Sequence, residues 1–175
     1  MRIIPLTPEL ISTYNRVGTD SYHEHYLHLW PNANPSDYID NNFNAQLVAQ
    51  EIKDKNLRHF LVEEQGEVAG IMKLVVDSPI EPYSARQAIF LEKIYLLNRH
   101  SGQGMGKKCI SYIIEFSNSL GKEILWLDTM QKGRALGFYL DLGFEIFGEK
   151  LLHFSNALQD QRPMYQLRLL LASKS

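Results

Sequence analysis

The first third of the chain alternates apolar runs with breaks, a pattern typical of one edge strand followed by helices. Residues 2–6 form a short apolar run, and Pro5 within it favours a strand at the edge of a sheet. The pair Thr7-Pro8 is typical of a helix start, and the predicted helix extends towards Trp30. After a break rich in proline and asparagine, a second helix is predicted from about residue 36 to about residue 55.

Beyond that helix the apolar runs are separated by glycines and polar turns, which indicates strands. We predict strands over residues 59–62, 68–76, 88–97, 123–128, 144–154 and 164–171. The first two flank a short polar turn that contains Gly66, so they predict an antiparallel hairpin. Helices are predicted over 104–120 and 132–142, and each is followed by a glycine where helices commonly end.

The order of these elements predicts a single domain, residues 1–175, of the α+β (mixed α/β) class. We expect a central, twisted, mostly antiparallel sheet of about seven strands, flanked by about four helices. One strand–helix–strand crossover, at the glycine-rich stretch after residue 97, predicts a parallel pair of strands.

Composition narrows the range of functions. The formal net charge is −2, so a nucleic-acid binder that relies on bulk positive charge is not expected. Every apolar run is shorter than the roughly 18 residues of a membrane span, and the first is too short for a signal peptide. The one cysteine, Cys109, excludes an internal disulfide framework. We expect a cytoplasmic protein with no membrane or nucleic-acid partner.

The stretch from Ile89 to Lys108 carries the most specific chemical signal. An apolar strand leads into Gly102, Gly104 and Gly106, and an amphipathic helix follows at once. Glycines allow a tight turn whose N–H groups converge on an anion, and a helix start adds unpaired N–H donors and a positive dipole end. The stretch therefore predicts a phosphate or pyrophosphate site.

Two common phosphate loops fit this stretch poorly. A P-loop requires Ser or Thr where Lys108 stands and Gly where Ser101 stands, so that interpretation is excluded. A dinucleotide fingerprint requires G-x-G-x-x-G, whereas the spacing here is G-x-G-x-G. The spacing makes this interpretation weak, but it stays open because a candidate acid, Asp128, does lie at the end of the next strand.

A third kind of loop fits better. The segment Ser101-Gly-Gln-Gly104-Met-Gly106 resembles the pyrophosphate loop of the GNAT superfamily of acyl-CoA N-acyltransferases, except that the family usually has Arg or Gln where Ser101 stands. Lys132 likewise replaces a usual Asn at the start of a second family segment. The chain matches that segment at Ala135, Phe138, Tyr139, Gly143 and Phe144. Within the superfamily the chain looks most like the PaiA-type branch, which acetylates polyamines such as spermidine and spermine.

The resemblance implies a GNAT-like fold with acetyl-CoA as co-substrate and no metal. In this family, backbone N–H groups supply most of the grip on the pyrophosphate, so Ser101 implies weaker CoA binding but not its loss. The strand before the loop would offer its backbone to the pantetheine and the thioester. The implied CoA-binding residues are Ile94, Tyr95, Leu96, Leu97, Ser101, Gly102, Gln103, Gly104, Met105, Gly106, Lys107, Lys132, Ala135 and Phe138.

Two residues are candidates for the acid and the base of acetyl transfer. Tyr139 matches the family tyrosine whose hydroxyl lies near the CoA sulfur and acts as a general acid; the alternative is a core aromatic on a helix face. Glu92 interrupts an apolar strand, where a carboxylate is costly unless it faces a cleft or a partner, and it is the candidate base. The alternative is a salt bridge with the neighbours of Lys93 or a position on an edge strand, and the sequence leaves the base and this alternative open.

The resemblance also implies where the acceptor binds. In this family the first helices shape the acceptor cleft, so the resemblance implies that His25, Tyr26 and Trp30 bind substrate. His25 and His28 also have a spacing that metal ligands use, but no third ligand has a diagnostic spacing, so no metal is expected.

The implied reaction is transfer of the acetyl group of acetyl-CoA to a primary amine by direct attack in a ternary complex. The expected partner is a small-molecule amine or a polyamine. Two alternatives stay open, a protein N-terminal or lysine acetyltransferase and a non-catalytic CoA-binding regulatory module. The family resemblance is also consistent with a homodimer.

Overall fold

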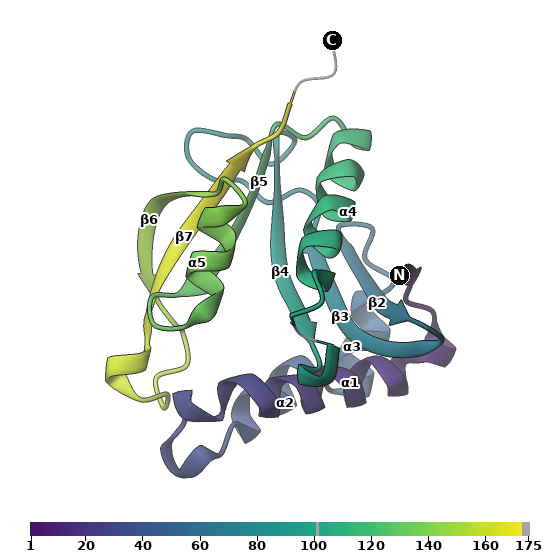
Figure 1. The fold of residues 1–175 in the computed structure, drawn as a ribbon, viewed down its shortest axis with the longest axis vertical. Coiled ribbons are helices and arrows are strands. Elements are labelled where there is room, and N and C mark those ends of the chain that lie inside the picture. Colours follow the sequence, from purple (N-terminus) through teal and green to yellow (C-terminus); the bar gives the residue numbers. More distant parts are fainter. Residues whose placement is uncertain (101, 173–175) are drawn as a thin grey trace.

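One seven-stranded sheet organises the part of the chain that the computed structural model describes, residues 1–100 and 102–172. Its strands, in the spatial order β1-β2-β3-β4-β5-β7-β6, are drawn in Figure 1. β4 and β5 run parallel, and the other neighbours run antiparallel. This confirms the predicted fold class. The strands are β1 Arg2–Pro5, β2 Leu57–Glu64, β3 Glu67–Val75, β4 Ala88–Leu96, β5 Ile124–Met130, β6 Glu145–Leu151 and β7 Pro163–Leu170.

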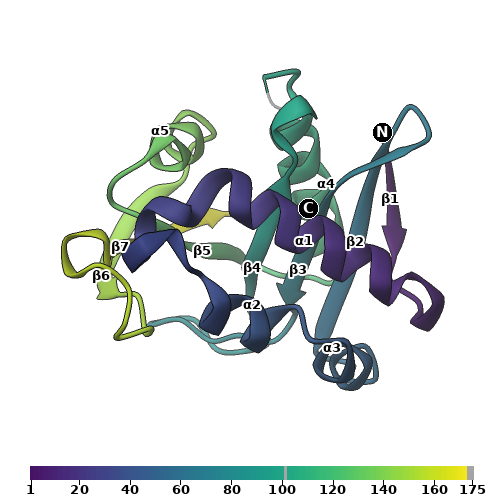
Figure 2. The ribbon, with the colours of Figure 1, turned by 90° about the horizontal axis from the view of Figure 1, so that it is seen from below.

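Helices cover both faces of the sheet, and Figure 2 shows α1 crossing it. The α-helices are α1 Ile11–Tyr26, α2 Ser36–Asn42, α3 Ala45–Glu51, α4 Met105–Ser119 and α5 Arg134–Asp141. Short 3-10 helices are η1 Pro8–Leu10, η2 Leu27–Leu29, η3 Pro31–Ala33, η4 Asn98–His100 and η5 Gln159–Gln161. The face covered by the first three α-helices is called the α1–α3 face, and the other the α4–α5 face.

Alternation along the strands divides the apolar residues between two cores. Phe60 and Val62 of β2 pack on the α4–α5 face with Cys109 and Ile113 of α4, whereas Leu61 packs on the α1–α3 face. Because side chains of a strand alternate between faces, a run that is apolar at every position is typical of a strand covered on both sides.

Several local predictions are confirmed in detail. The predicted hairpin is β2 and β3, joined by Gln65 and Gly66, both with positive φ, so the turn is tighter than the polar segment indicated. α4 ends as predicted at Gly121, which has φ +69. The N–H of Lys122 donates to the carbonyl of Ser117 at 3.0 Å, which closes the helix with the hydrogen bond typical of a glycine-terminated helix.

The predicted helix from 36 to 55 is instead two helices, α2 and α3. The prediction of one continuous helix was wrong because Asn44 caps the start of a second helix. The side-chain oxygen of Asn44 accepts hydrogen bonds from the N–H groups of Gln46 and Leu47, at 2.9 and 3.3 Å. This cap satisfies donors that a continuous helix would have bonded to its preceding turn. Apolar spacing persists through the break, so periodicity alone does not reveal it.

Two helix glycines offer a matched test of the packing. An added Cβ on Gly18 of α1 would lie 2.2 Å from Cε1 of Phe43, whose side chain is buried, whereas one on Gly137 of α5 would meet nothing within 4 Å. We expect Gly137→Ala to raise the free energy of unfolding by about 1 kcal/mol through helix propensity. Gly18→Ala should gain the same helix propensity, but overpacking against Phe43 should lower the free energy of unfolding by about 1–3 kcal/mol and so offset the gain. Urea unfolding measures both, and equal stabilities of the two variants would contradict the close packing of Phe43.

Candidate functional site

The parallel strands β4 and β5 separate halfway along their length. They pair from Ala88 with Ile124 to Leu91 with Leu127, and beyond that point β4 pairs only with β3. In the β3 register, Leu91 and Lys93 face consecutive residues, so Glu92 is the extra residue of a β-bulge. A bulge bends its strand, and here it coincides with the divergence of the strands that Figure 1 shows. The β4 backbone beyond the bulge therefore has one edge free towards β5.

The loop after β4 leads to a helix start without a side-chain cap. Gly104, the residue before α4, has φ +73, and Gly102 has φ +75. An added Cβ at either glycine would meet no atom within 4 Å, so the outer side of the loop is open. The first N–H groups of α4 have no partner within the helix, which suits an anion. This geometry fits the predicted pyrophosphate site, although Ser101 itself lies outside the described residues.

α5 packs against the first turn of α4. An added Cβ on Gly106 would lie 3.1 Å from Cζ of Phe138, so the glycine permits the close approach of this ring. The neighbouring Tyr139 is buried, and its ring lies against those of Phe138 and Phe144. Phe138 thus contacts the first turn of α4, and Tyr139 packs in the core of the α4–α5 face.

Burial determines the protonation state of Tyr139. It raises the pKa of the Tyr139 hydroxyl above its usual value because the phenolate loses its hydration. Within residues 1–100 and 102–172, no hydrogen bond of this hydroxyl is found. The group is therefore protonated at neutral pH and has its proton to donate.

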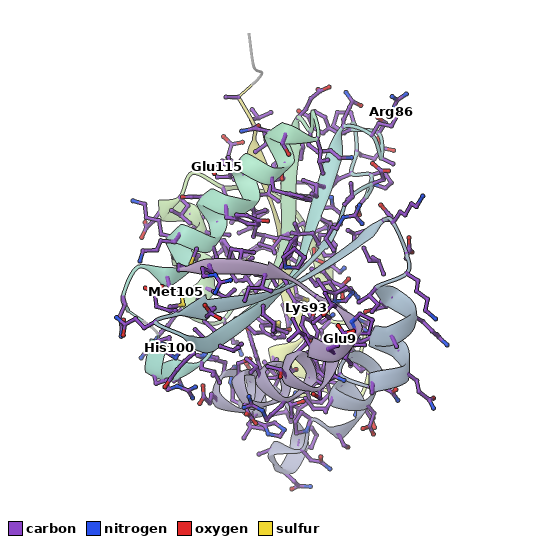
Figure 3. The ribbon with its side chains drawn as sticks, turned by 90° about the vertical axis from the view of Figure 1, so that its right-hand side faces the viewer. Glu9, Arg86, Lys93, His100, Met105 and Glu115 are labelled. Carbon is purple, nitrogen blue, oxygen red and sulfur yellow. The ribbon has the colours of Figure 1, made fainter. Side chains whose placement is uncertain are left out.

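An ion cluster lies behind the bulge. Because a bulge places two consecutive side chains on one face, Glu92 and Lys93 both reach the α1–α3 face, where they form an ion pair. Lys73 Nζ lies 3.0 Å from Oε1 of Glu92 and 2.6 Å from Oε1 of Glu51. Oε2 of Glu51 lies 3.2 Å from Nε2 of His59. Figure 3 shows Lys93 inside the molecule, and its side chain is only 3% exposed.

The charges of this cluster set its protonation. Burial raises the pKa of the Glu92 carboxyl, but Lys93 and Lys73 outweigh burial, so this pKa lies below its usual value. Burial likewise raises the pKa of the Glu51 carboxyl, but His59 and Lys73 outweigh burial and lower this pKa to about 2. Both carboxylates are therefore ionised at neutral pH.

The predicted pantetheine-binding segment lies along the free edge of β4. Ile94 and Leu96 pack on the α4–α5 face, whereas Tyr95 and Leu97 pack on the α1–α3 face. His25 bonds the carbonyl oxygen of Leu96 through Nε2, at 2.8 Å. This contact connects the end of α1 to β4, so His25 has a structural role. Its predicted role in substrate binding stays a prediction.

Aromatic side chains fill the space between α1, α2 and β4. The rings of Tyr26 and Tyr95 lie 5.5 Å apart, and the hydroxyls of Tyr38 and Tyr95 are 2.5 Å apart. Trp30 is 2% exposed, and its indole N–H donates to the Tyr22 hydroxyl at 3.0 Å. The structure thus places Trp30 in the core and the half-buried Tyr26 at the margin of the core. The substrate contacts predicted for both residues stay predictions.

Of the remaining predicted CoA contacts, Met105 is buried in the core of the α4–α5 face, and the others described lie at the surface. Lys107 and Gln103 are exposed beside the start of α4, and Ala135 is exposed on the first turn of α5. Lys132 pairs with Asp160 at 2.9 Å, and both side chains are exposed. The structure therefore brings Lys107 to the glycine loop but gives Lys132 a partner of its own.

The sequence did not indicate Lys73, Glu51 and His59 as parts of the site. They come from three different elements, and their spacing matches no motif, so only the fold brings them together. One signal was available in the sequence: Lys73 lies inside the apolar run of β3. A buried lysine is costly unless it is paired, so its position indicates a buried partner of opposite charge.

Two searches of the described residues were negative. No group of three or more His, Cys, Asp or Glu side chains there is arranged to hold a metal ion. No helix in this part of the chain is both long and apolar enough to cross a membrane. The cytoplasmic location and the homodimer stay predictions.

Comparison with known proteins identifies the family. The model of the Acetyltransferase (GNAT) family matches residues 19–144, so the chain belongs to this family. Among curated proteins, it is 26% identical over 113 residues to an N-acetyltransferase of Lactobacillus delbrueckii subsp. lactis and 31% identical over 97 residues to N-acetyltransferase 8F1 of Rattus norvegicus. These matches cover 64% and 53% of this chain, but only 65% and 42% of those relatives.

Solved structures share the fold over almost the whole chain. The PaiA N-acetyltransferase of Thermoplasma acidophilum, in complex with coenzyme A, superposes with a TM-score of 0.75 at 14% identity, covering 97% of this chain and 99% of that one. The spermidine N-acetyltransferase of Vibrio cholerae, in complex with CoA and spermine, gives 0.73 at 17% identity, covering 97% and 95%. Because the sequence identities are this low, these two comparisons show a shared fold and no more.

The low pKa of Glu51 predicts a pH-dependent contribution to stability. Because folding lowers this pKa from 4.5 to about 2, the contribution is present above about pH 4.5 and is lost as the pH falls towards 2. We expect Glu51→Gln to be destabilised relative to the natural protein at pH 7, with the gap narrowing towards pH 3.

Urea unfolding across this pH range measures the gap. Glu63→Gln is the control, because Glu63 pairs with the exposed Arg2 and should change stability by less than about 1 kcal/mol. A gap of constant size for Glu51→Gln would show that the carboxylate charge contributes nothing.

Proposed function

We propose that this protein transfers the acetyl group of acetyl-CoA to a primary amine, and that the acceptor is a small molecule or a polyamine. The observation that carries the proposal is the separation of β4 from β5 at Glu92, next to an uncapped helix start and to Tyr139. We infer that the free strand edge, the candidate anion site, the Glu92 carboxylate and the protonated Tyr139 hydroxyl together form the acetyl-transfer site.

The proposed CoA site follows from these groups. The N–H groups at the start of α4 and the loop from Gly102 to Gly106 would bind the pyrophosphate. The free edge of β4, from Ile94 to Leu97, would bind the pantetheine by backbone hydrogen bonds. Lys107 would add a positive charge beside the phosphates. The two solved neighbours that carry CoA in their complexes support this assignment.

In the proposed reaction, the amine nitrogen attacks the thioester carbonyl carbon. An N–C bond forms, the C–S bond breaks, and the acetylated amine and CoA are the products. The Glu92 carboxylate takes a proton from the nitrogen, directly or through water, once bond formation has made that nitrogen acidic. Tyr139 gives its proton to the departing thiolate. Holding both substrates in line accounts for much of the acceleration.

The acceptor would approach from the α1–α3 face. Glu92 opens to this face, and Tyr26 and Tyr95 present aromatic rings there, which attract an ammonium group. His25 lies close by through its bond to β4, whereas Trp30 would act from behind by supporting the aromatic cluster. The spermine complex of the Vibrio cholerae neighbour supports a polyamine acceptor.

An assay of free thiol tests the proposal. The protein is incubated with acetyl-CoA and spermidine, spermine, a short diamine, an N-terminal peptide or a lysine peptide, and CoA release is followed. We expect release with a polyamine or small amine. Release only with peptides would support a protein acetyltransferase instead, and CoA binding without release in any mixture would overturn catalysis.

Removing the Tyr139 hydroxyl tests the acid. Tyr139→Phe should lower kcat by about 10²-fold, the lower end for loss of a general acid, while the Kd for CoA stays unchanged. Tyr112→Phe is the matched control, since Tyr112 is a half-buried tyrosine of α4 that stacks on Phe116. Equal kcat values for the two variants would remove Tyr139 from the mechanism.

A pair of left-handed glycines tests the anion site. Gly104→Ala forces a side chain into a positive-φ position at the helix start, so we expect the Kd for CoA to rise about tenfold. Gly66→Ala imposes the same kind of strain in the β2–β3 turn and should leave CoA binding unchanged. Isothermal titration measures both, and equal Kd values would place the pyrophosphate elsewhere.

A further inference from the structure

The ion cluster on the α1–α3 face contains more buried charge than packing explains. Lys73 and Lys93 have side chains only 7% and 3% exposed, and His59 is 1% exposed. Taking such groups out of water is costly, and replacing a buried ion pair by apolar residues is often neutral or stabilising. The cluster therefore suggests a purpose other than stability.

The contacts of Lys73 point to that purpose. Its ammonium lies between two carboxylates, 2.6 Å from Glu51 and 3.0 Å from Glu92. Oε2 of Glu51 in turn lies 3.2 Å from Nε2 of His59, whose other ring nitrogen, Nδ1, bonds the Tyr14 hydroxyl at 3.1 Å. A chain of contacts from α1, β2 and α3 thus ends on the one carboxylate that lies at the bulge.

We propose that Lys73, held by Glu51, is a positioning residue that fixes the Glu92 carboxylate in its ionised form at the point where β4 leaves β5. This inference rests on the proposed function, in which Glu92 is the base. Lys73 does not touch the reacting atoms; it acts through Glu92. Lys93 pairs with the same carboxylate oxygen, so the two lysines hold Glu92 between neighbouring strands.

The groups that face Glu92 balance in charge. Lys93 on its own strand and Lys73 on β3 are positive, and Glu51 on α3 is negative. Tyr14 on α1 and Tyr38 on α2 stay neutral, because burial raises their pKa values well above the usual range. Two further groups lie on neighbouring strands: Nε2 of His59 on β2 is 3.2 Å from Glu51, and Asp128 of β5 pairs with Lys150.

Two lysines therefore offset two glutamates. Removing the charge of Lys73 leaves an excess negative charge beside Glu92, which disfavours its ionised form. Removing the charge of Glu51 instead leaves an excess positive charge, which does not. The two substitutions thus affect the same contact in opposite electrostatic directions.

The pH profile of kcat/KM, measured by CoA release, separates this role from a structural one. Glu92 must be ionised to accept a proton, so activity falls on the acidic side as Glu92 is protonated. We expect Lys73→Met and Lys73→Gln to move this acidic limb upward by roughly one pH unit or more. Lys73→Arg, which keeps the charge, should retain the natural limb, and Glu51→Gln should not move it upward.

A merely structural role predicts a different result, a uniform loss of activity with the limb unmoved in every variant. That result would overturn the inference, and so would a Lys73→Gln protein that does not fold, because it would show that Lys73 serves folding. Failure of the proposed function is distinguishable: the natural protein would then release no CoA with any amine. Natural turnover with an unmoved limb for Lys73→Gln rejects the positioning role alone.

Discussion

The candidate site depends on the extra residue at Glu92 in β4. A parallel pair of strands would otherwise continue its hydrogen bonds to the end, and the sheet would have no opening. The bulge ends the pairing at Leu91, frees one edge of β4 and places Glu92 and Lys93 on the same face. The backbone edge and the charged cluster therefore have one origin. The loop of Gly102 to Gly106 follows the same strand, so the candidate anion site lies near the end of the free β4 edge.

Much of the fold could be predicted because its signals are local. The β2–β3 hairpin and the end of α4 depend on glycines with positive φ and on neighbouring residues, which a sequence displays directly. The division between α2 and α3 could not be predicted from periodicity, because Asn44 caps a helix without interrupting the apolar spacing. The course of β7 between β5 and β6 likewise depends on long-range pairing rather than on any local pattern.

The same distinction applies to the candidate site. The glycine loop and Tyr139 could be found because each belongs to a segment of contiguous residues with a defined spacing. For Glu92 the sequence left two interpretations, a base or an ion pair; the structure shows the ion pair, and the role as base stays a proposal. Lys73 and Glu51 could not be found, since their neighbours in space are distant in sequence. Trp30 shows the opposite difficulty: its sequence neighbourhood indicated a cleft, but its side chain lies in the core.

The position of β7 has a consequence for how this protein is made. Beyond Leu127, β5 no longer pairs with β4, so its residues Asp128 to Met130 are held in the sheet only by Gln166, Tyr165 and Met164 of β7. One side of the separation between β4 and β5 is thus held by the strand that comes last of the seven in sequence order. A nascent chain that already contains the glycine loop and Tyr139 still has that side unpaired, and the site is completed only after β7 has inserted between β5 and β6.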